Sequence, residues 1–119
     1  MTQLQAALAG RVTPAMKQVA HDENLPIEAV REAIASGRAV IPLNPAHRGA
    51  RPMGVGRMFR TKVNANLGRS PTQSERGGEL DKLTVALKAG ADFVMDLSVG
   101  PELGAIRQGM LDASPVPLG

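Results

Sequence analysis

The sequence contains no cysteine, no tryptophan and no tyrosine. Without a thiol the chain can form no disulfide, and it can supply no thiolate to a metal ion or an iron–sulfur cluster. Aromatic residues make up only 2% of the 119 residues, and both of them are phenylalanine. We therefore expect a thin core built from leucine, valine, isoleucine, alanine and methionine, without large anchoring rings.

Long apolar runs and a strong charge of one sign are also missing. No stretch approaches the length needed to span a membrane, and the first ten residues lack the basic start and apolar run of a signal peptide. Fourteen basic and eleven acidic side chains leave a net charge of +3, and the basic residues lie scattered without interleaved aromatic residues. These features predict a soluble, cytoplasmic chain with neither a membrane partner nor a nucleic-acid partner.

Residues 1–60 are expected to form an N-terminal helical segment followed by a loop. Thr13 as N-cap and Pro14 at the first helical position predict a helix over residues 13–24. The helical spacing of the apolar residues that follow predicts a second helix over residues 26–37. We expect these two helices to make up the N-terminal quarter.

Residues 39–43 have the composition of a short strand, but Pro42 lacks a backbone N–H and restricts this strand to an edge or an end. Residues 44–56 are rich in glycine, proline and arginine, which predicts a long loop. Gly-Val-Gly at 54–56 resembles part of a phosphate-binding loop. A phosphate-binding loop should follow a strand, but this segment precedes the strand predicted at 62–67. We therefore predict no phosphate site there.

His21 and His47 have no carboxylate or second histidine at a recognised metal-ligand spacing. We expect both histidines to be solvated or locally hydrogen-bonded. The sequence also lacks a nucleotide-binding loop, a hydrolase nucleophile motif and a nucleophile–base pair. The pattern therefore assigns no catalytic residue and no metal ligand to this chain.

Residues 61–119 predict the start of a parallel βα barrel. The expected elements are a strand at 62–67, a helix at 74–89, a strand at 92–97, a helix from residue 100 onward, and the start of a third strand at 115–119. The two strands begin about 30 residues apart, as in a right-handed parallel crossover of an eight-fold barrel. Such a barrel takes about 250 residues to close, so we expect an α/β chain that is a truncated (β/α)8 barrel.

The helix expected at 74–89 follows a turn over residues 68–72. Leu80, Leu83 and Leu87 recur at helical spacing, so we predict that they form its buried face.

Chemistry in a βα barrel lies at the carboxyl ends of the strands, which singles out Asn64, Asn66, Met95, Asp96 and Ser98. A structural explanation is also open for these residues. Asn66 could cap the following turn, and Met95 could fill a gap in the core. A carboxylate within an apolar strand must be paired, so Asp96 is either part of a structural network or a functional acid.

Two segments carry a resemblance to a known family. Thr-Lys-Val-Asn-Ala-Asn-Leu-Gly at 61–68 and Ala-Asp-Phe-Val-Met-Asp-Leu-Ser at 91–98 resemble the paired signatures of the phosphomethylpyrimidine synthase, or thiamine-pyrimidine synthase, family. Segments 40–47, 52–56 and 113–119 also resemble the family, in the same order. The resemblance covers nearly the whole chain and implies the N-terminal portion of a short-form member.

Members of that family are radical S-adenosylmethionine lyases, which convert 5-aminoimidazole ribotide into hydroxymethylpyrimidine phosphate for thiamine biosynthesis. They use a 4Fe-4S cluster and a zinc ion and are expected to be homodimers when intact. The resemblance implies that Asn66 and Met95 contact the ribotide. The family's cluster cysteines and zinc histidines lie beyond residue 119, so we expect this chain to hold none of these cofactors and to be inactive alone.

Two alternatives remain open at this point. A close relative of the family forms 5-hydroxybenzimidazole from the same ribotide, and the residues present do not separate the two products. The chain could also be a degenerate, non-catalytic interaction module that pairs its open strand edges with a partner.

Overall fold

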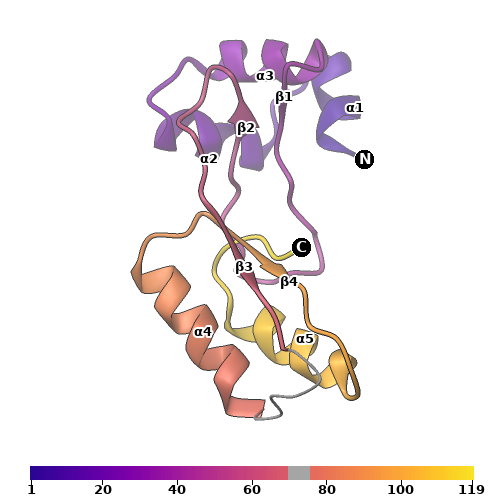
Figure 1. Ribbon diagram of the computed structural model, residues 1–119. Coiled ribbons are helices and arrows are strands. Elements are labelled where there is room, and N and C mark those ends of the chain that lie inside the picture. Colours follow the sequence, from indigo (N-terminus) through magenta and orange to yellow (C-terminus); the bar gives the residue numbers. More distant parts are fainter. Residues whose placement is uncertain (70–75) are drawn as a thin grey trace. The chain divides into compact units, whose positions relative to one another are not determined.

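The computed structural model describes residues 1–69 and 76–119 (Figure 1). The chain divides into two compact units. Unit 1 comprises Met1–Leu43 and Pro52–Thr61, and unit 2 comprises Asn44–Arg51 and Lys62–Gly119. No helix in the described ranges is long and apolar enough to cross a membrane.

Unit 1 begins with a helix that the sequence analysis did not expect, α1 (Gln3–Leu8). A capping box starts it: the Thr2 hydroxyl accepts a hydrogen bond from the Gln5 N–H at 3.1 Å, and the Gln5 side chain accepts one from the Thr2 N–H at 2.9 Å. Arg31 also donates to the carbonyl oxygen of Ala7 at 3.2 Å. The prediction of two N-terminal helices was therefore wrong, because this third one is too short to show a clear apolar period.

The two predicted helices are present as α2 (Pro14–Asp22) and α3 (Ile27–Ala35). The Thr13 hydroxyl accepts a hydrogen bond from the Met16 N–H at 3.2 Å, which confirms Thr13 as the N-cap of α2. Gly37 follows α3 with a φ of +72°, a left-handed conformation that suits glycine at the end of a helix.

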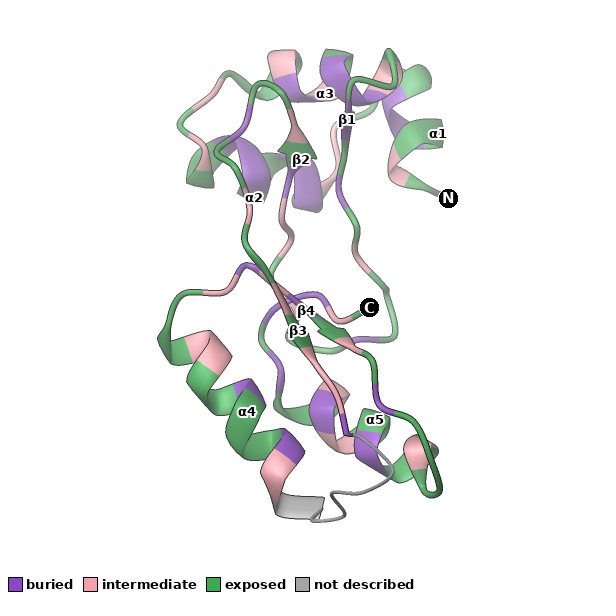
Figure 2. Cartoon of the chain, in the orientation of Figure 1, coloured by how far each residue is buried: buried purple, intermediate pink, exposed green. Residues whose placement is uncertain are grey.

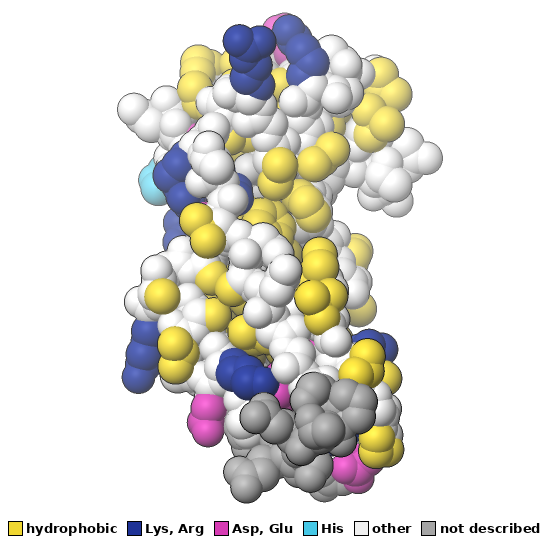
Figure 3. All heavy atoms as spheres, in the orientation of Figure 1, with side chains coloured by type: hydrophobic (Ala, Val, Ile, Leu, Met, Phe, Trp, Pro, Cys, Tyr) yellow, Lys and Arg dark blue, Asp and Glu magenta, His cyan; other side chains and the backbone are white. Residues whose placement is uncertain are grey.

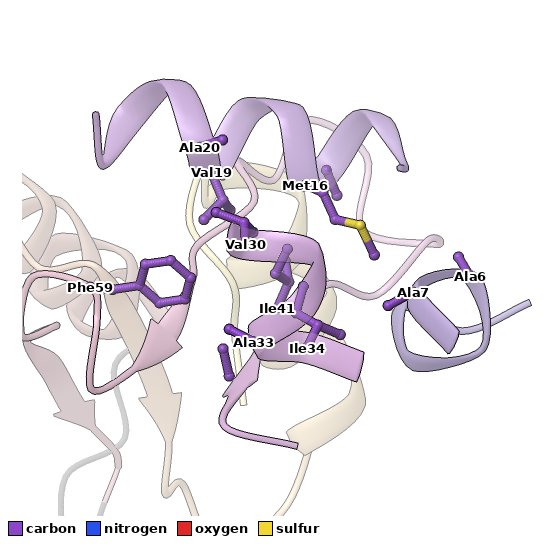
Figure 4. Packing of buried hydrophobic residues seen from close by; sticks show 12 residues of the cluster. Ala6, Ala7, Met16, Val19, Ala20, Val30, Ala33, Ile34, Ile41 and Phe59 are labelled. Carbon is purple, nitrogen blue, oxygen red and sulfur yellow. The ribbon is translucent and has the colours of Figure 1, made fainter. Parts of the chain in front are cut away.

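The apolar faces of the helices meet in one core (Figure 4). Met16 and Val19 of α2 point toward Val30 and Ile34 of α3, and all four are almost completely buried. The same cluster includes Ala6, Ala7, Ala15, Ala20, Ala33, Ala39, Ile41 and Phe59. Unit 1 thus has a continuous core made mostly of small and aliphatic side chains, as the composition predicts.

A short antiparallel pair of strands completes unit 1. β1 (Ala39–Val40) pairs with β2 (Val55–Gly56). The strand predicted over residues 39–43 is only two residues long, because Pro42 cannot donate to a partner strand. β2 lies within the segment that was expected to be loop.

Close packing explains the glycines at positions 54 and 56. A Cβ atom at Gly54 would lie 2.6 Å from Val19 Cγ1 and 2.8 Å from Phe59 Cε2. One at Gly56 would lie 2.9 Å from the Cβ of Ala39. Both glycines therefore allow the chain to approach neighbouring atoms that any side chain would displace.

Unit 2 contains the predicted βα repeat. β3 (Asn64–Leu67) and β4 (Phe93–Asp96) are parallel neighbours, and α4 (Arg76–Lys88) lies between them in the chain. α5 (Leu103–Ala113) follows β4. The parallel crossover is therefore confirmed, whereas the turn predicted over residues 68–72 and the helix start at 74 fall partly outside the described residues.

A third parallel segment begins beside β4, where Leu118 forms a bridge with Val94. This bridge lies within the run at 115–119 that the sequence analysis proposed as a further strand. The observed architecture is a mixed α/β chain with short sheets, and closure into a barrel stays a prediction.

The buried face of α4 is narrower than predicted. Leu83 is 1% exposed, but Leu80 is 40% exposed and Leu87 only half-buried. Leu80 borders an open hollow of about 200 Å³ with Ala105 and Ile106 of α5, so helical spacing alone overestimated its burial.

Candidate functional site

The pairing of β3 with β4 brings the two expected substrate residues together. Asn66 is the register partner of Met95, and Asn64 is the partner of Phe93. Because side chains alternate along a strand, these four residues share one face of the pair. Asn64, Asn66 and Met95 are exposed, and Met95 has a relative exposure of 40%. Figure 2 shows exposed segments in both β3 and β4.

The opposite face of the strands is directed to the protein interior. Val94 is 1% exposed, and the Asp96 side chain reaches Arg107 of α5. A parallel sheet is normally covered on both faces, so an open face that carries two amides and a thioether is available for a ligand or for further chain.

The contacts and exposure of Asn66 and Met95 bear on the structural roles that the pattern left open. The Asn66 side-chain oxygen accepts a hydrogen bond from Asn64 Nδ2 at 2.7 Å, and this contact lies along the strand and not in the following turn. Met95 is 40% exposed, so it fills no gap in the core that these 119 residues form. The turn that Asn66 could cap lies partly outside the described residues, so the structural alternatives stay hypotheses beside the substrate role.

Asp96 ends β4 and belongs to a buried network. Its side chain is 2% exposed, and its two oxygens accept hydrogen bonds from Arg107 Nε and from the Ser98 N–H, each at 2.9 Å. Burial raises the pKa of Asp96, but the hydrogen bonds from Ser98 and Arg107 and the Arg107 charge outweigh it. The pKa of Asp96 therefore lies below its usual range, and the carboxylate is held in a hydrogen-bonded network with Ser98 and Arg107.

The loops after the two strands are tied to each other. The Ser98 hydroxyl accepts a hydrogen bond from the Arg69 N–H at 3.1 Å, and the Val99 N–H donates to the Arg69 carbonyl oxygen at 3.1 Å. The Arg69 guanidinium also donates to the carbonyl oxygen of Pro101. A Cβ at Gly68 would lie only 3.0 Å from the backbone of Leu97. These contacts hold the carboxyl ends of β3 and β4 in one arrangement.

The two histidines differ from each other. The His21 side chain is 85% exposed and lies 3.3 Å from the Asp22 carboxylate, as expected for a solvated residue. His47 is 7% exposed, and its Nε2 donates to the carbonyl oxygen of Ser114 at 2.8 Å. The expectation of a solvated or local contact was wrong for His47, because its partner lies 67 positions away in the sequence.

Charged side chains could mark another site. On the face shown in Figure 3, arginine and lysine side chains lie in separate groups. In unit 1, Arg38 and Arg57 border a surface hollow of about 440 Å³ together with Glu32 and Met58. All four side chains are exposed, so this hollow lacks the desolvated polar groups of a built ligand site.

The residues present do not fit a protein-held cluster or metal. The chain has no cysteine, and cysteine thiolates are the usual ligands of a four-iron cluster. In the described part of the chain, no group of three or more histidine, aspartate or glutamate side chains could hold a metal ion.

The chain is similar to known proteins along nearly its whole length. The family model described as "Radical SAM ThiC family" matches residues 2–119. A protein named phosphomethylpyrimidine synthase from Moorella thermoacetica is 50% identical over 119 residues, which is 100% of this chain and 28% of the relative. The protein of the same name from Halobacterium salinarum is 53% identical over 118 residues, or 99% of this chain and 25% of the relative.

A third relative has a similar name. Phosphomethylpyrimidine synthase 1 from Methanosphaera stadtmanae is 48% identical over 119 residues, which again cover 28% of that protein. The chain thus spans about a quarter of the length of the relatives it matches. Because the family match extends over nearly all of the sequence, the chain belongs to the radical SAM ThiC family.

Proposed function

We propose that the chain provides the N-terminal part of a radical S-adenosylmethionine lyase that converts 5-aminoimidazole ribotide into hydroxymethylpyrimidine phosphate in thiamine biosynthesis. The family match and the printed names of the relatives support this proposal. Those names also favour the pyrimidine product over the benzimidazole product. For the intact enzyme we propose a cytoplasmic homodimer that acts on a small molecule, with no nucleic-acid or membrane partner.

Asn66 and Met95 are the residues that we propose as substrate contacts. The observation that supports them is their pairing across two parallel strands, with both side chains exposed on the same face. An amide offers hydrogen bonds to the polar atoms of a ribotide, and a thioether offers a flexible apolar surface to its ring or sugar. One polar and one apolar contact at adjacent positions suit a ligand that has both characters.

The chain's own part in the reaction is to bind and orient the substrate. When bound to the intact enzyme, S-adenosylmethionine and a 4Fe-4S cluster would supply the radical chemistry, and zinc would lie near the substrate. Since this chain has no cysteine, we propose that the cluster ligands and the zinc ligands are residues outside these 119. The chain alone is then expected to have no lyase activity.

Calorimetric titration of the chain with aminoimidazole ribotide tests the proposed contacts. We expect saturable binding that Asn66→Ala weakens about fivefold, since one net hydrogen bond is worth about 1 kcal/mol. Gln18→Ala is a matched control, because it removes an exposed side-chain amide from α2 in unit 1. Equal affinities of wild type and Asn66→Ala would contradict the role of Asn66.

A further inference from the structure

The side-chain amide of Asn66 already takes part in a hydrogen bond within the protein. Asn64 and Asn66 lie two positions apart on β3 and share a face, and Asn64 Nδ2 donates to Asn66 Oδ1 at 2.7 Å. A carboxamide oxygen has two lone pairs that accept hydrogen bonds, and its nitrogen has two N–H donors. Asn64 engages one lone pair of the Asn66 oxygen and thereby fixes the side of the amide on which the oxygen lies, whereas both N–H donors of Nδ2 remain for a ligand.

We propose that Asn64 is a positioning residue that fixes the polarity of the Asn66 amide, so that the site offers N–H donors to the ligand. The site would then select hydrogen-bond acceptors: the unsubstituted ring nitrogen, the sugar oxygens or the phosphate oxygens of a ribotide. A ligand that placed only N–H donors at this position would be disfavoured. The inference rests on the proposed function and deepens it, since it states which atoms of the substrate Asn66 recognises.

The residues opposite Asn64 and Asn66 on β4 offer no nitrogen or oxygen atom that could orient the Asn66 amide. Phe93 and Met95 stand opposite the two asparagines in the register, and neither side chain has a nitrogen or oxygen atom. In the described part of the chain, Asn64 is the residue whose side chain contacts the Asn66 amide through a hydrogen bond. Removing Asn64 should therefore release the Asn66 amide to rotate, without changing the strand pairing.

A measurement without ligand tests the orientation itself. The Cγ resonance of Asn66 in carbon-13 NMR reports whether its carbonyl oxygen accepts a hydrogen bond. We expect Asn64→Ala to shift this resonance upfield, and Gln18→Ala to leave it unchanged. An Asn66 Cγ resonance that does not respond to Asn64→Ala overturns the proposed orientation.

Binding of the ribotide tests the consequence. Asn64→Ala is expected to weaken binding about two- to threefold, because the Asn66 amide must then be ordered by the ligand. Asn64→Asp should weaken it more, by about tenfold, because a carboxylate only accepts hydrogen bonds. The Asn66 Nδ2 group would turn toward that carboxylate, and the Asn66 oxygen would face the acceptor atoms of the ligand.

The negative charge that Asn64→Asp adds could also repel the ligand's phosphate, and a second ligand separates the two effects. Aminoimidazole riboside lacks the phosphate and is uncharged there. If the amide has been turned, the greater loss in Asn64→Asp than in Asn64→Ala persists with the riboside. If the extra loss disappears with the riboside, the charge alone explains it and the inference is overturned.

The outcomes distinguish this inference from the proposed function. Saturable wild-type binding that is weakened by Asn66→Ala but unchanged by Asn64→Asp keeps the substrate contact and overturns the role of Asn64. No saturable binding by the wild-type chain overturns the substrate contact and the inference together. A small loss of affinity in Asn64→Ala and a larger loss in Asn64→Asp, seen with the ribotide and with the riboside, support the substrate contact and the role of Asn64.

Discussion

Unit 1 and unit 2 bury different kinds of side chain. Every buried polar or charged residue in the described ranges lies in unit 2, and these residues are His47, Arg69, Glu79, Asp92, Ser98 and Ser114. The buried side chains of unit 1 are apolar. The buried interior of unit 1 therefore depends on apolar packing, whereas the interior of unit 2 also contains polar side chains, including Ser98 near the strand ends, where the candidate site lies. The difference predicts distinct responses to mutation and to pH.

Truncating the core of unit 1 should have the largest effect. Met16 is 0% exposed, so Met16→Ala is expected to lower the free energy of unfolding of unit 1 by about 2–4 kcal/mol through lost burial and the cavity left behind. Urea unfolding followed by circular dichroism measures this loss. Leu8→Ala is the control, because Leu8 is 66% exposed, and its effect should stay within about 0.5 kcal/mol.

No titratable group takes part in that packing, so the Met16→Ala loss should be the same at about pH 4 and about pH 7. A loss that changed with pH would contradict the assignment of unit 1 to apolar packing.

Asp96→Asn should have a smaller effect that depends on pH. The substitution removes the ion pair with Arg107, and because the Arg107 side chain is 50% exposed we expect a loss of about 1–2 kcal/mol at neutral pH. The folded pKa of Asp96 is lowered, so its stabilisation is complete above the unfolded pKa of about 3.9. It is lost as the pH falls through the lowered folded pKa.

The wild-type chain and Asp96→Asn should therefore converge in stability at low pH, which urea unfolding over a pH series measures. Asp81→Asn provides the control, since Asp81 is exposed on α4. A constant difference between wild type and Asp96→Asn at every pH would show that the lost contact is steric and not ionic.

The elements that the sequence predicted are those specified by local signals. The Thr-Pro start of α2, the apolar spacing of α3 and the alternation of β3 act within a few residues, and each element formed. Pro42 restricted the strand predicted at 39–43 to an edge or an end, and the observed β1 stops two residues before it. The approximate positions of Asn66 and Met95 at strand ends followed from the same patterns.

Features that depend on distant parts of the chain were not predictable. The buried His47 forms a hydrogen bond with the carbonyl oxygen of Ser114, and no local sequence pattern predicts that contact. The hydrogen bond between Asn64 and Asn66 has a visible signal, because positions i and i+2 on a strand share a face. Whether two such amides bond to each other or to water depends on the apolar neighbours that β4 places opposite them.

α1 had a local signal that was overlooked, since Thr2 and Gln5 match a capping box. A helix of six residues is too short to be stable alone, so the cap and the burial of Ala6 and Ala7 must act together.

Thr2→Ala separates these two contributions and should have the smallest effect, about 0.5–1 kcal/mol, because it removes the cap and leaves the packing. Amide hydrogen exchange of residues 3–8 should accelerate by a corresponding factor of about two to five. Thr84→Ala is the matched control, because its hydroxyl bonds only within α4 to the Leu80 carbonyl oxygen, where alanine is well tolerated. Unchanged exchange in Thr2→Ala would mean that apolar packing, and not the cap, holds α1.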